Sequence, residues 1–314
     1  MEKLNGIQCN TMPFLTTLEE LPLVQQLRSF RLSSSKVTSF APIGEMKNIF
    51  SLELFDNPVK NLLGLEKLHT LKELRLSEKE ISDLIPLENL PALELLILTE
   101  MNLADFNSIQ TFKTLKRITL ERMTVPSFAF LKDLQNLENL FCDAVTVDSV
   151  EGLSELTYLT TLTLINCKMG NLSPAFSSLV GLTSLSIVGT KINSLGSLEF
   201  NKNLVELYIT EDHYTSEEVT AFKKLHPACS IYPGRGKNFP FSEFEIYEVL
   251  QELKMQNNRD NVKAGTKVKF TSYTNNSYDS VDMFYFSELD GKNSFLWTMY
   301  QYDDKRANDY FRKL

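Results

Sequence analysis

A pattern of apolar residues with the spacing L-x-x-L-x-L returns along the chain from Leu27 to Ile209. Successive motifs start 22 residues apart, except for one step of 23 between Leu159 and Leu182. A fixed period constrains a fold more than local propensity does, because every unit must take the same structure. The nine motifs are Leu27, Phe30, Leu32; Ile49, Leu52, Leu54; Leu71, Leu74, Leu76; Leu93, Leu96, Leu98; Leu115, Ile118, Leu120; Leu137, Leu140, Cys142; Leu159, Leu162, Leu164; Leu182, Leu185, Ile187; and Leu204, Leu207, Ile209.

The second half of each unit also repeats, with apolar residues at every third position, as at Ile81, Leu84 and Leu87. This spacing favours a tight 3₁₀ turn over a long α-helix. Each unit therefore combines a short strand with a compact return, and it cannot bury its apolar face alone. The units must stack, which predicts an α/β solenoid with one parallel sheet. Because the returns are bulkier than the strands, we expect the stack to curve with its strands inside.

Two weaker units flank the nine. Their motif residues are Leu4, Ile7 and Cys9 at one end and His226, Cys229 and Ile231 at the other. Terminal units of a repeat array face solvent on one side, so they commonly depart from the consensus. We therefore expect both to be end units of the same solenoid.

The repeats, with returns such as ISDLIPLENL, resemble leucine-rich repeats of the 22-residue internalin type over residues 4–231. The resemblance implies a curved solenoid with short 3₁₀ or helical returns. It implies no chemistry, because this family shares a shape rather than a reaction.

The family places Asn three residues after the last strand leucine, where the side chain bonds the turn. Here Asn57 alone does so, and Cys167 and Thr190 are familiar substitutes in the family. The other units have Ser35, Lys79, Met101, Met123, Val145 and Asp212 at this position. Since Met and Val side chains cannot form those hydrogen bonds, we expect less regular turns at Met101, Met123 and Val145.

The strand residues between the motif leucines point away from the core, because successive side chains of a strand face opposite sides. We call this surface the strand face; it would be the concave side of the solenoid. Large apolar residues lie there among charged ones, as protein interfaces have them. The candidate partner-binding residues are Arg31, Glu53, Phe55, Glu73, Arg75, Leu95, Ile97, Arg117, Glu121, Phe141, Asp143 and Tyr208. The alternative is ordinary scattered apolar surface, since β-propensity alone favours aromatic and branched residues in strands.

The repeat pattern stops after Ile209. Thr215 and Glu218 have the spacing of a capping box, which predicts an α-helix near the end of the solenoid domain, residues 1–232. A Gly- and Pro-rich segment then marks a boundary.

Residues 233–314 are predicted to form a small α+β module of no recognised family. We expect a helix that starts at Ser242, then three strands within residues 266–302, with Asp290-Gly291 as a hairpin turn. A short helix in residues 304–314 would follow. The module either covers the end of the solenoid or is an independent binding or effector domain.

The net charge of −8 belongs to the repeats, since residues 1–232 hold 20 Lys and Arg against 28 Asp and Glu, and residues 233–314 hold 12 of each. An acidic surface repels phosphate backbones, so we expect no nucleic acid partner and a basic patch on a partner protein. No apolar run reaches the ~20 residues of a membrane span, so no membrane association is expected. We also expect a monomer.

The four cysteines fall at inward-pointing repeat positions, whole units apart and without CxxC spacing. They predict buried thiols, with no disulfide and no zinc site. Residues 1–25 carry no signal-like segment, and together these features predict a cytoplasmic protein.

We predict no enzyme, metal or cofactor. The three histidines lack metal-ligand or triad spacing, and residues 234–237 lack the spacing of a phosphate loop. No cysteine follows Cys229, which excludes a cysteine-dependent enzyme in the C-terminal module, such as the ubiquitin-ligase domain of some bacterial effectors. A hydrolase that uses Glu288 or Asp290 stays open, although a polar hairpin turn explains both residues.

These features predict a non-catalytic scaffold for protein–protein interaction that holds a folded partner on its concave strand face. The alternative is a bacterial effector or immunity-type protein, in which the C-terminal module carries the activity and the repeats select the target.

Overall fold

A computed structural model of the chain describes residues 6–19, 27–88, 90–210, 213–234, 246–249, 263–264, 266–276, 281–288, 294–300 and 311–313. The chain divides into two compact units, Met1–Gly236 and Lys237–Leu314. The first unit contains all the repeats, and the second contains the non-repetitive residues. Within the described ranges, no helix is long and apolar enough to cross a bilayer.

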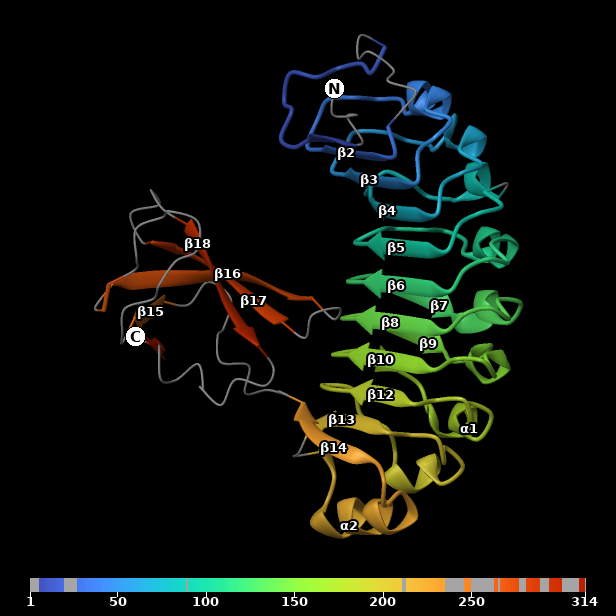
Figure 1. Ribbon diagram of the computed structural model, residues 1–314, viewed down its shortest axis with the longest axis vertical. Coiled ribbons are helices and arrows are strands. Elements are labelled where there is room, and N and C mark those ends of the chain that lie inside the picture. The colour runs from blue at the N-terminus through green and yellow to red at the C-terminus, as the bar shows by residue number, and fades with distance from the viewer. Residues whose placement is uncertain are drawn as a thin grey trace. The chain divides into compact units, whose positions relative to one another are not determined.

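One parallel sheet of eleven strands forms the first unit, with the strands stacked in chain order along one side of a solenoid (Figure 1). Each of the nine motifs and both end units supplies a strand, so the predicted leucine-rich-repeat solenoid is confirmed; Leu4 lies outside the described residues. The strands are β1 (Gly6–Cys9), β2 (Ser29–Ser33), β3 (Ser51–Phe55), β4 (Glu73–Ser77), β5 (Leu95–Thr99), β6 (Arg117–Glu121), β8 (Asn139–Asp143), β10 (Thr161–Ile165), β12 (Ser184–Ile187), β13 (Glu206–Thr210) and β14 (Ser230–Gly234).

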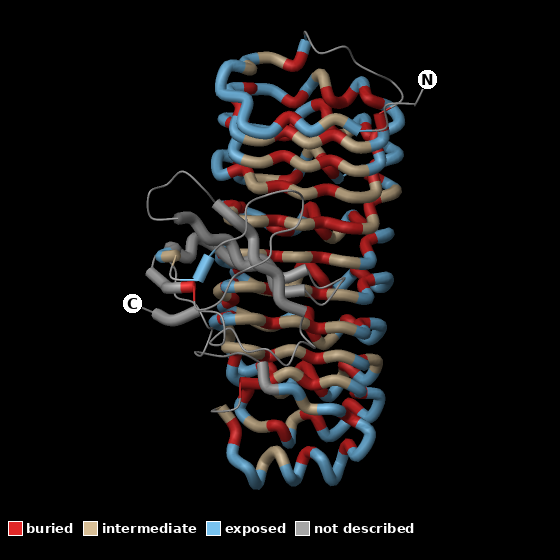
Figure 2. Tube along the Cα trace, turned by 60° about the vertical axis from the view of Figure 1, so that its left-hand side comes forward, coloured by how far each residue is buried: buried red, intermediate tan, exposed pale blue. Residues whose placement is uncertain are grey.

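Short returns connect the strands on the other side of the solenoid, where apolar residues at every third position fit 3₁₀ turns. The middle motif residue is 0% exposed in every unit from Phe30 to Leu207, and stacking joins these residues into one continuous core (Figure 2). The returns are η1 (Ala41–Glu45), η2 (Leu65–Lys67), η3 (Ile85–Leu87), η4 (Asn107–Thr111), η5 (Phe128–Leu131), η6 (Leu153–Glu155), η7 (Leu195–Leu198) and the single-turn α1 (Ser173–Phe176).

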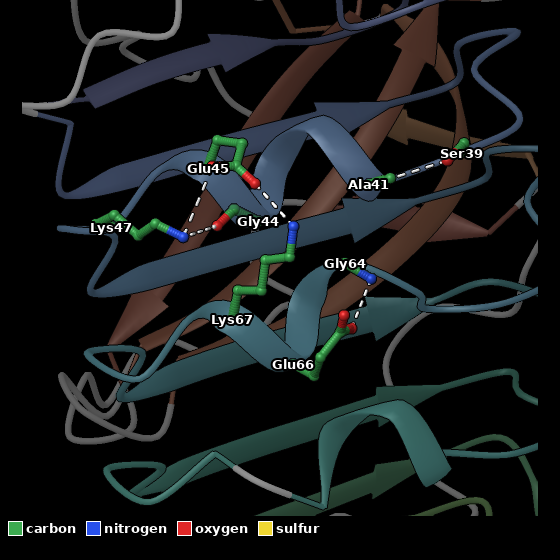
Figure 3. Close-up of polar contacts among 8 residues, drawn as sticks. All are labelled: Ser39, Ala41, Gly44, Glu45, Lys47, Gly64, Glu66 and Lys67. Atoms are coloured by element: carbon green, nitrogen blue, oxygen red, sulfur yellow. Dashed lines mark hydrogen bonds and ion pairs between the residues drawn. The ribbon is translucent and has the colours of Figure 1, made fainter.

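The first two returns approach each other so closely that glycine is required at their contact. Figure 3 shows the polar contacts around Gly44 and Gly64. A Cβ atom added at Gly44 would overlap the carbonyl oxygen of Gly64, and Gly64 has a φ of 100°. Beside the contact, Lys67 pairs with Glu45 at 2.8 Å, and the carboxylate of Glu66 accepts the N–H of Gly64 at 2.6 Å. Glycine therefore permits the close packing of these returns, and polar groups hold their orientation.

Asn57 holds the turn after β3. Its Oδ1 atom accepts hydrogen bonds from the backbone N–H and the hydroxyl of Ser35, at 3.3 and 2.6 Å, and its Nδ2 atom donates to the carbonyl of Phe55 at 3.1 Å. In the next turn Glu78, not Lys79, extends this network. The Glu78 carboxylate accepts from the N–H and from Nδ2 of Asn57, both at 2.7 Å, and Glu78 is 0% exposed.

Cys167 replaces Asn in a later turn, as the family pattern suggests. Its backbone N–H donates to the hydroxyl of Thr190 at 2.8 Å. Its thiol donates to the carbonyls of Cys142 and Ile165, at 3.4 and 3.3 Å. The thiol thus supplies the donor that the Asn amide supplies elsewhere.

The expectation of less regular turns at Met123 and Val145 is wrong. Their carbonyls accept the backbone N–H of Thr146 and of Lys168 in the next turn, at 3.0 and 2.9 Å. These turns join a second parallel sheet, made of β7 (Thr124–Ser127), β9 (Thr146–Ser149) and β11 (Lys168–Met169). Backbone hydrogen bonds between turns therefore connect these units although no Asn side chain is present.

Helix α2 (Ser216–Leu225) follows the last repeat motif and begins with the predicted capping box. The Thr215 hydroxyl accepts the N–H of Glu218 at 3.2 Å, and the Glu218 carboxylate accepts the N–H of Thr215 at 3.1 Å. Both bonds satisfy N–H groups that an isolated helix end leaves unpaired.

The second unit contains one antiparallel sheet, in the order β18-β17-β16-β15-β19. Three of its strands are the predicted ones. The strands are β15 (Ile246–Val249), β16 (Lys267–Asn276), β17 (Val281–Glu288), β18 (Ser294–Tyr300) and β19 (Phe311–Lys313).

Both helices predicted for the second unit are wrong where the structure describes them, because β15 and β19 are strands that pair with each other. Over so few residues the apolar spacing fits either period, and pairing with neighbouring strands decides the outcome. The other residues of those two segments, and Asp290-Gly291, lie outside the described residues.

Candidate partner-binding surface

All twelve predicted residues lie on strands of the first unit, at positions that alternate with the buried motif residues. Eleven of them are partly exposed. Leu95 is the exception, with 8% exposure, so the prediction that it faces water is wrong. The register places Leu95 between Glu73 and Arg117 on the neighbouring strands. Long side chains of this kind cover apolar neighbours with their stems.

The N-terminal part of the strand face carries an ion-paired row across β2, β3 and β4. Glu53 pairs with Arg31 at 3.1 Å and with Arg75 at 3.5 Å. The Arg31 guanidinium also lies over the Phe55 ring, 4.9 Å from its centroid. These contacts hold the exposed side chains in place, so this part presents a preordered charged and aromatic surface.

Two carboxylates lie opposite each other on β6 and β8, Glu121 and Asp143. Glu121 has partners, since it accepts the Thr99 hydroxyl at 3.2 Å and lies 3.8 Å from the Arg122 guanidinium. Burial raises the pKa of Asp143, and the charge of Glu121 raises it further. Two adjacent acids favour a cationic or neutral group over an anionic one at this point of the strand face.

At the C-terminal end of the strand face, one row of residues in register contains three aromatic side chains. Phe141 on β8 is followed in register by Thr163, Ser186, Tyr208 and Tyr232 on the next four strands. The Tyr208 and Tyr232 rings stack with centroids 4.9 Å apart. Tyr232 is 36% exposed and was not among the predicted residues. Its place beside the inward motif residue of the last unit could have revealed it by alternation.

The four cysteine thiols lie in the interior of the solenoid and not on the strand face. All four cysteines are free and buried, and burial raises the pKa of Cys167 and of Cys229 to about 11. The thiolate, which is the reactive form, is therefore scarce at neutral pH. Within the part of the chain that the structure describes, no three metal-ligating side chains come together.

No family model matches the chain, and no curated protein matches it. Solved structures do share its fold. Internalin C2 from Listeria monocytogenes is 23% identical with a TM-score of 0.51, over 57% of this chain and 79% of that one. A leucine-rich-repeat protein from Leptospira interrogans is 23% identical with a TM-score of 0.59, over 73% of this chain and 60% of that one.

A plant peptide hormone receptor, solved in complex with RGF2, is 18% identical with a TM-score of 0.51, over 74% of this chain and 38% of that one. At these sequence identities a structural match establishes a shared fold, but it does not assign the activity of the matched proteins to this chain. With its eleven stacked parallel strands and short returns, the first unit of the chain has the leucine-rich-repeat fold of the internalins.

Proposed function

We propose that the chain is a non-catalytic scaffold that binds a partner protein on its strand face. The observation that carries the proposal is a set of partly exposed apolar side chains, Phe55, Ile97, Phe141 and Tyr208, fixed in register on one sheet among charged residues. Interfaces combine apolar anchors with a polar surround. A rigid sheet also loses little conformational entropy when a partner binds.

The fold supports this proposal, because a stack of strands offers one long surface to a macromolecule. A plant receptor of similar fold was solved in complex with RGF2. The acidic repeats favour a protein with a basic patch over a nucleic acid. We further propose that the chain acts as a monomer in the cytoplasm, where buried thiols such as Cys142 and Cys167 stay reduced.

A triple variant tests the proposal: Phe55→Ala, Phe141→Ala and Tyr208→Ala in the full chain. We expect capture of the partner from a lysate of the source cell to fall at least about tenfold, because three anchors are lost. The melting temperature should change by less than about 4 °C, since all three side chains are partly exposed. Mass spectrometry of the captured proteins supplies the comparison.

The matched control removes three exposed apolar residues from the returns, Leu63, Ile85 and Phe200, which are 58%, 61% and 55% exposed. Proteins retained by the control triple and lost by the strand-face triple are the specific partners. Equal capture by both triples would rule out the strand face as the binding surface.

A further inference from the structure

The strand face changes in character along the solenoid. On β2, β3, β4, β6 and β8 it carries charges, many of them paired, such as Arg31 with Glu53, whereas β5 presents Leu95, Ile97 and Thr99. On β10 and β12 it carries none. The strand-face residues of these two strands, and the one that follows β12, are Thr161, Thr163, Ile165, Ser184, Ser186 and Val188. Charge returns with Glu206 on β13.

These uncharged strands lie between two aromatic positions. Phe141 on β8, Thr163, Ser186 and Tyr208 on β13 follow one another in register. Strands in a sheet lie about 4.8 Å apart, so the backbones beneath Phe141 and Tyr208 are about 14 Å apart. The result is a band of small hydroxyl side chains with an aromatic ring at each side. We call Thr161, Thr163 and Ser186, which Phe141 and Tyr208 flank, the hydroxyl band.

Several hydroxyls of the band are free to bond a ligand. Ser184, at its margin, donates to the carboxylate of Glu206 at 3.3 Å. The hydroxyls of Thr161, Thr163 and Ser186 have no hydrogen-bond partner among the residues that the structure describes. All three residues are partly exposed. A hydroxyl can donate and accept, so these groups can pair with the N–H and C=O groups of an extended backbone.

We propose that the hydroxyl band binds an extended, uncharged peptide segment of the partner, which crosses the strands with two apolar side chains four residues apart. This inference rests on the proposed function, because it names what the partner presents. In an extended chain, side chains four residues apart face the same way and lie about 13 Å apart. That spacing matches the distance between Phe141 and Tyr208.

The absence of charge and the free hydroxyls of the band favour an extended, uncharged peptide segment over other ligands. The band carries no counter-ion for a charged residue, so a charge placed there would lose hydration without compensation. An α-helix already satisfies its own backbone groups, whereas an extended segment needs donors and acceptors of the kind that Thr163 and Ser186 offer. The residue midway between the two apolar ones would lie over the centre of the band, and we expect it to be small.

Short labelled peptides test this inference with the full chain. The probes are fluorescein-labelled, C-terminally amidated peptides of the form Ser-X-Ser-Z-Ser-X-Ser, with Leu, Ile, Phe, Tyr or Pro at X and Gly, Ser, Glu or Lys at Z. Fluorescence polarisation gives the affinities. We expect Gly or Ser at Z to bind best, and Glu or Lys at Z to weaken binding about tenfold. Peptides with the two X residues adjacent to Z should weaken to a similar extent.

Variants of the protein place the binding on the band. Ser186→Lys puts a charge at its centre and should weaken the best peptide at least about tenfold, whereas Ser51→Lys makes the same change on β3 and should leave affinity within about twofold. Thr163→Val keeps the shape and removes one hydroxyl, so a loss of about two- to fivefold is expected. Because Thr163→Val is nearly isosteric, it tests the band even if the Ser186→Lys variant fails to fold.

The inference is overturned if affinity ignores the spacing or the charge at Z, or if Ser186→Lys binds as the unchanged protein does. It is equally overturned if no peptide binds up to about 1 mM. In each case, loss of protein capture in the variant at Phe55, Phe141 and Tyr208 would still support the proposed function, with a partner that binds in another way.

Discussion

Glu78 is a buried carboxyl that has no cationic partner among the residues that the structure describes. It accepts two hydrogen bonds from Asn57, while the neighbouring Lys79 pairs with Glu100 at 3.5 Å and the nearby Asp56 is also acidic. Burial raises the pKa of Glu78 from 4.5 to about 7 despite the Asn57 bonds. In the folded protein the neutral acid is therefore preferred at pH values where an unfolded chain would be ionised.

The raised pKa predicts a pH-dependent stability. Below pH 4.5 the group is protonated in both states, and as pH rises from 4.5 to about 7 the unfolded state alone loses its proton, so folding becomes less favourable. We expect Glu78 to lower the free energy of unfolding by about 2 to 3 kcal/mol across this interval. Urea unfolding of the protein and of Glu78→Gln between pH 4 and 8 measures the effect.

The Gln variant should lose this part of the pH dependence, whatever its stability at a single pH. Equal slopes for both proteins would show that Glu78 does not titrate in this range.

The sequence did not reveal the role of Glu78, because Lys79 occupies the family position. Equivalent residues such as Asp56 and Glu100 have positive φ, at 53° and 54°, whereas Glu78 is not among the residues with positive φ. That backbone difference, which no residue pattern encodes, accompanies its inward side chain.

At the scale of elements, the returns pack through glycine where side chains would collide. Gly44→Ala places a methyl group against the Gly64 carbonyl, which is backbone and cannot rotate away. We expect the free energy of unfolding to fall by about 1 to 3 kcal/mol, as for other overpacked sites. Chemical denaturation at constant pH measures the change.

Gly170→Ala is the matched control for this change. An added Cβ there would meet only the Asp148 carbonyl, at an ordinary contact distance of 3.9 Å. Its effect should stay within about 0.5 kcal/mol. If both variants lost the same stability, crowding between the first two returns would not be the cause.

Elements were predictable where the repeat imposed them and unpredictable where it did not. Each strand from β2 to β13 of the large sheet begins two residues after the first residue of its motif, and α2 follows its capping box. The small sheet of β7, β9 and β11 arises from pairing between turns that the sequence alone does not bring together. The mixed spacing around Tyr247 suggested a helix, yet β15 is set by antiparallel pairing with β16 and β19. Such long-range pairing overrides local periodicity.

For the whole molecule, the period was enough to predict the stack, because units that cannot be stable alone must bury their faces on one another. The candidate surface followed from the same alternation, and eleven of its twelve residues are partly exposed as expected. The contacts among these side chains could not be predicted from the sequence. Neither the Arg31–Glu53–Arg75 row nor the contacts around Leu95 can be derived from strand position, because long side chains choose among several neighbours.

The division into two units predicts that the repeats work alone. A chain that ends at Gly236 keeps β14 and α2, and its core is shared only between neighbouring repeats. We expect it to unfold cooperatively and to capture the same proteins as the full chain. Circular dichroism and the capture assay measure both properties. Loss of capture in a folded truncation would favour the alternative in which residues 237–314 carry the activity.

Asn57, Cys167 and Thr190 bond groups in adjacent turns, and none of these bonds reaches further along the stack. The number of repeats can therefore vary without disturbing the hydrogen bonds within the rest of the stack. An evolving gene can duplicate or delete one complete coil without redesigning the interior, and the same exchange moves a binding feature closer to its neighbour or further away by one strand spacing.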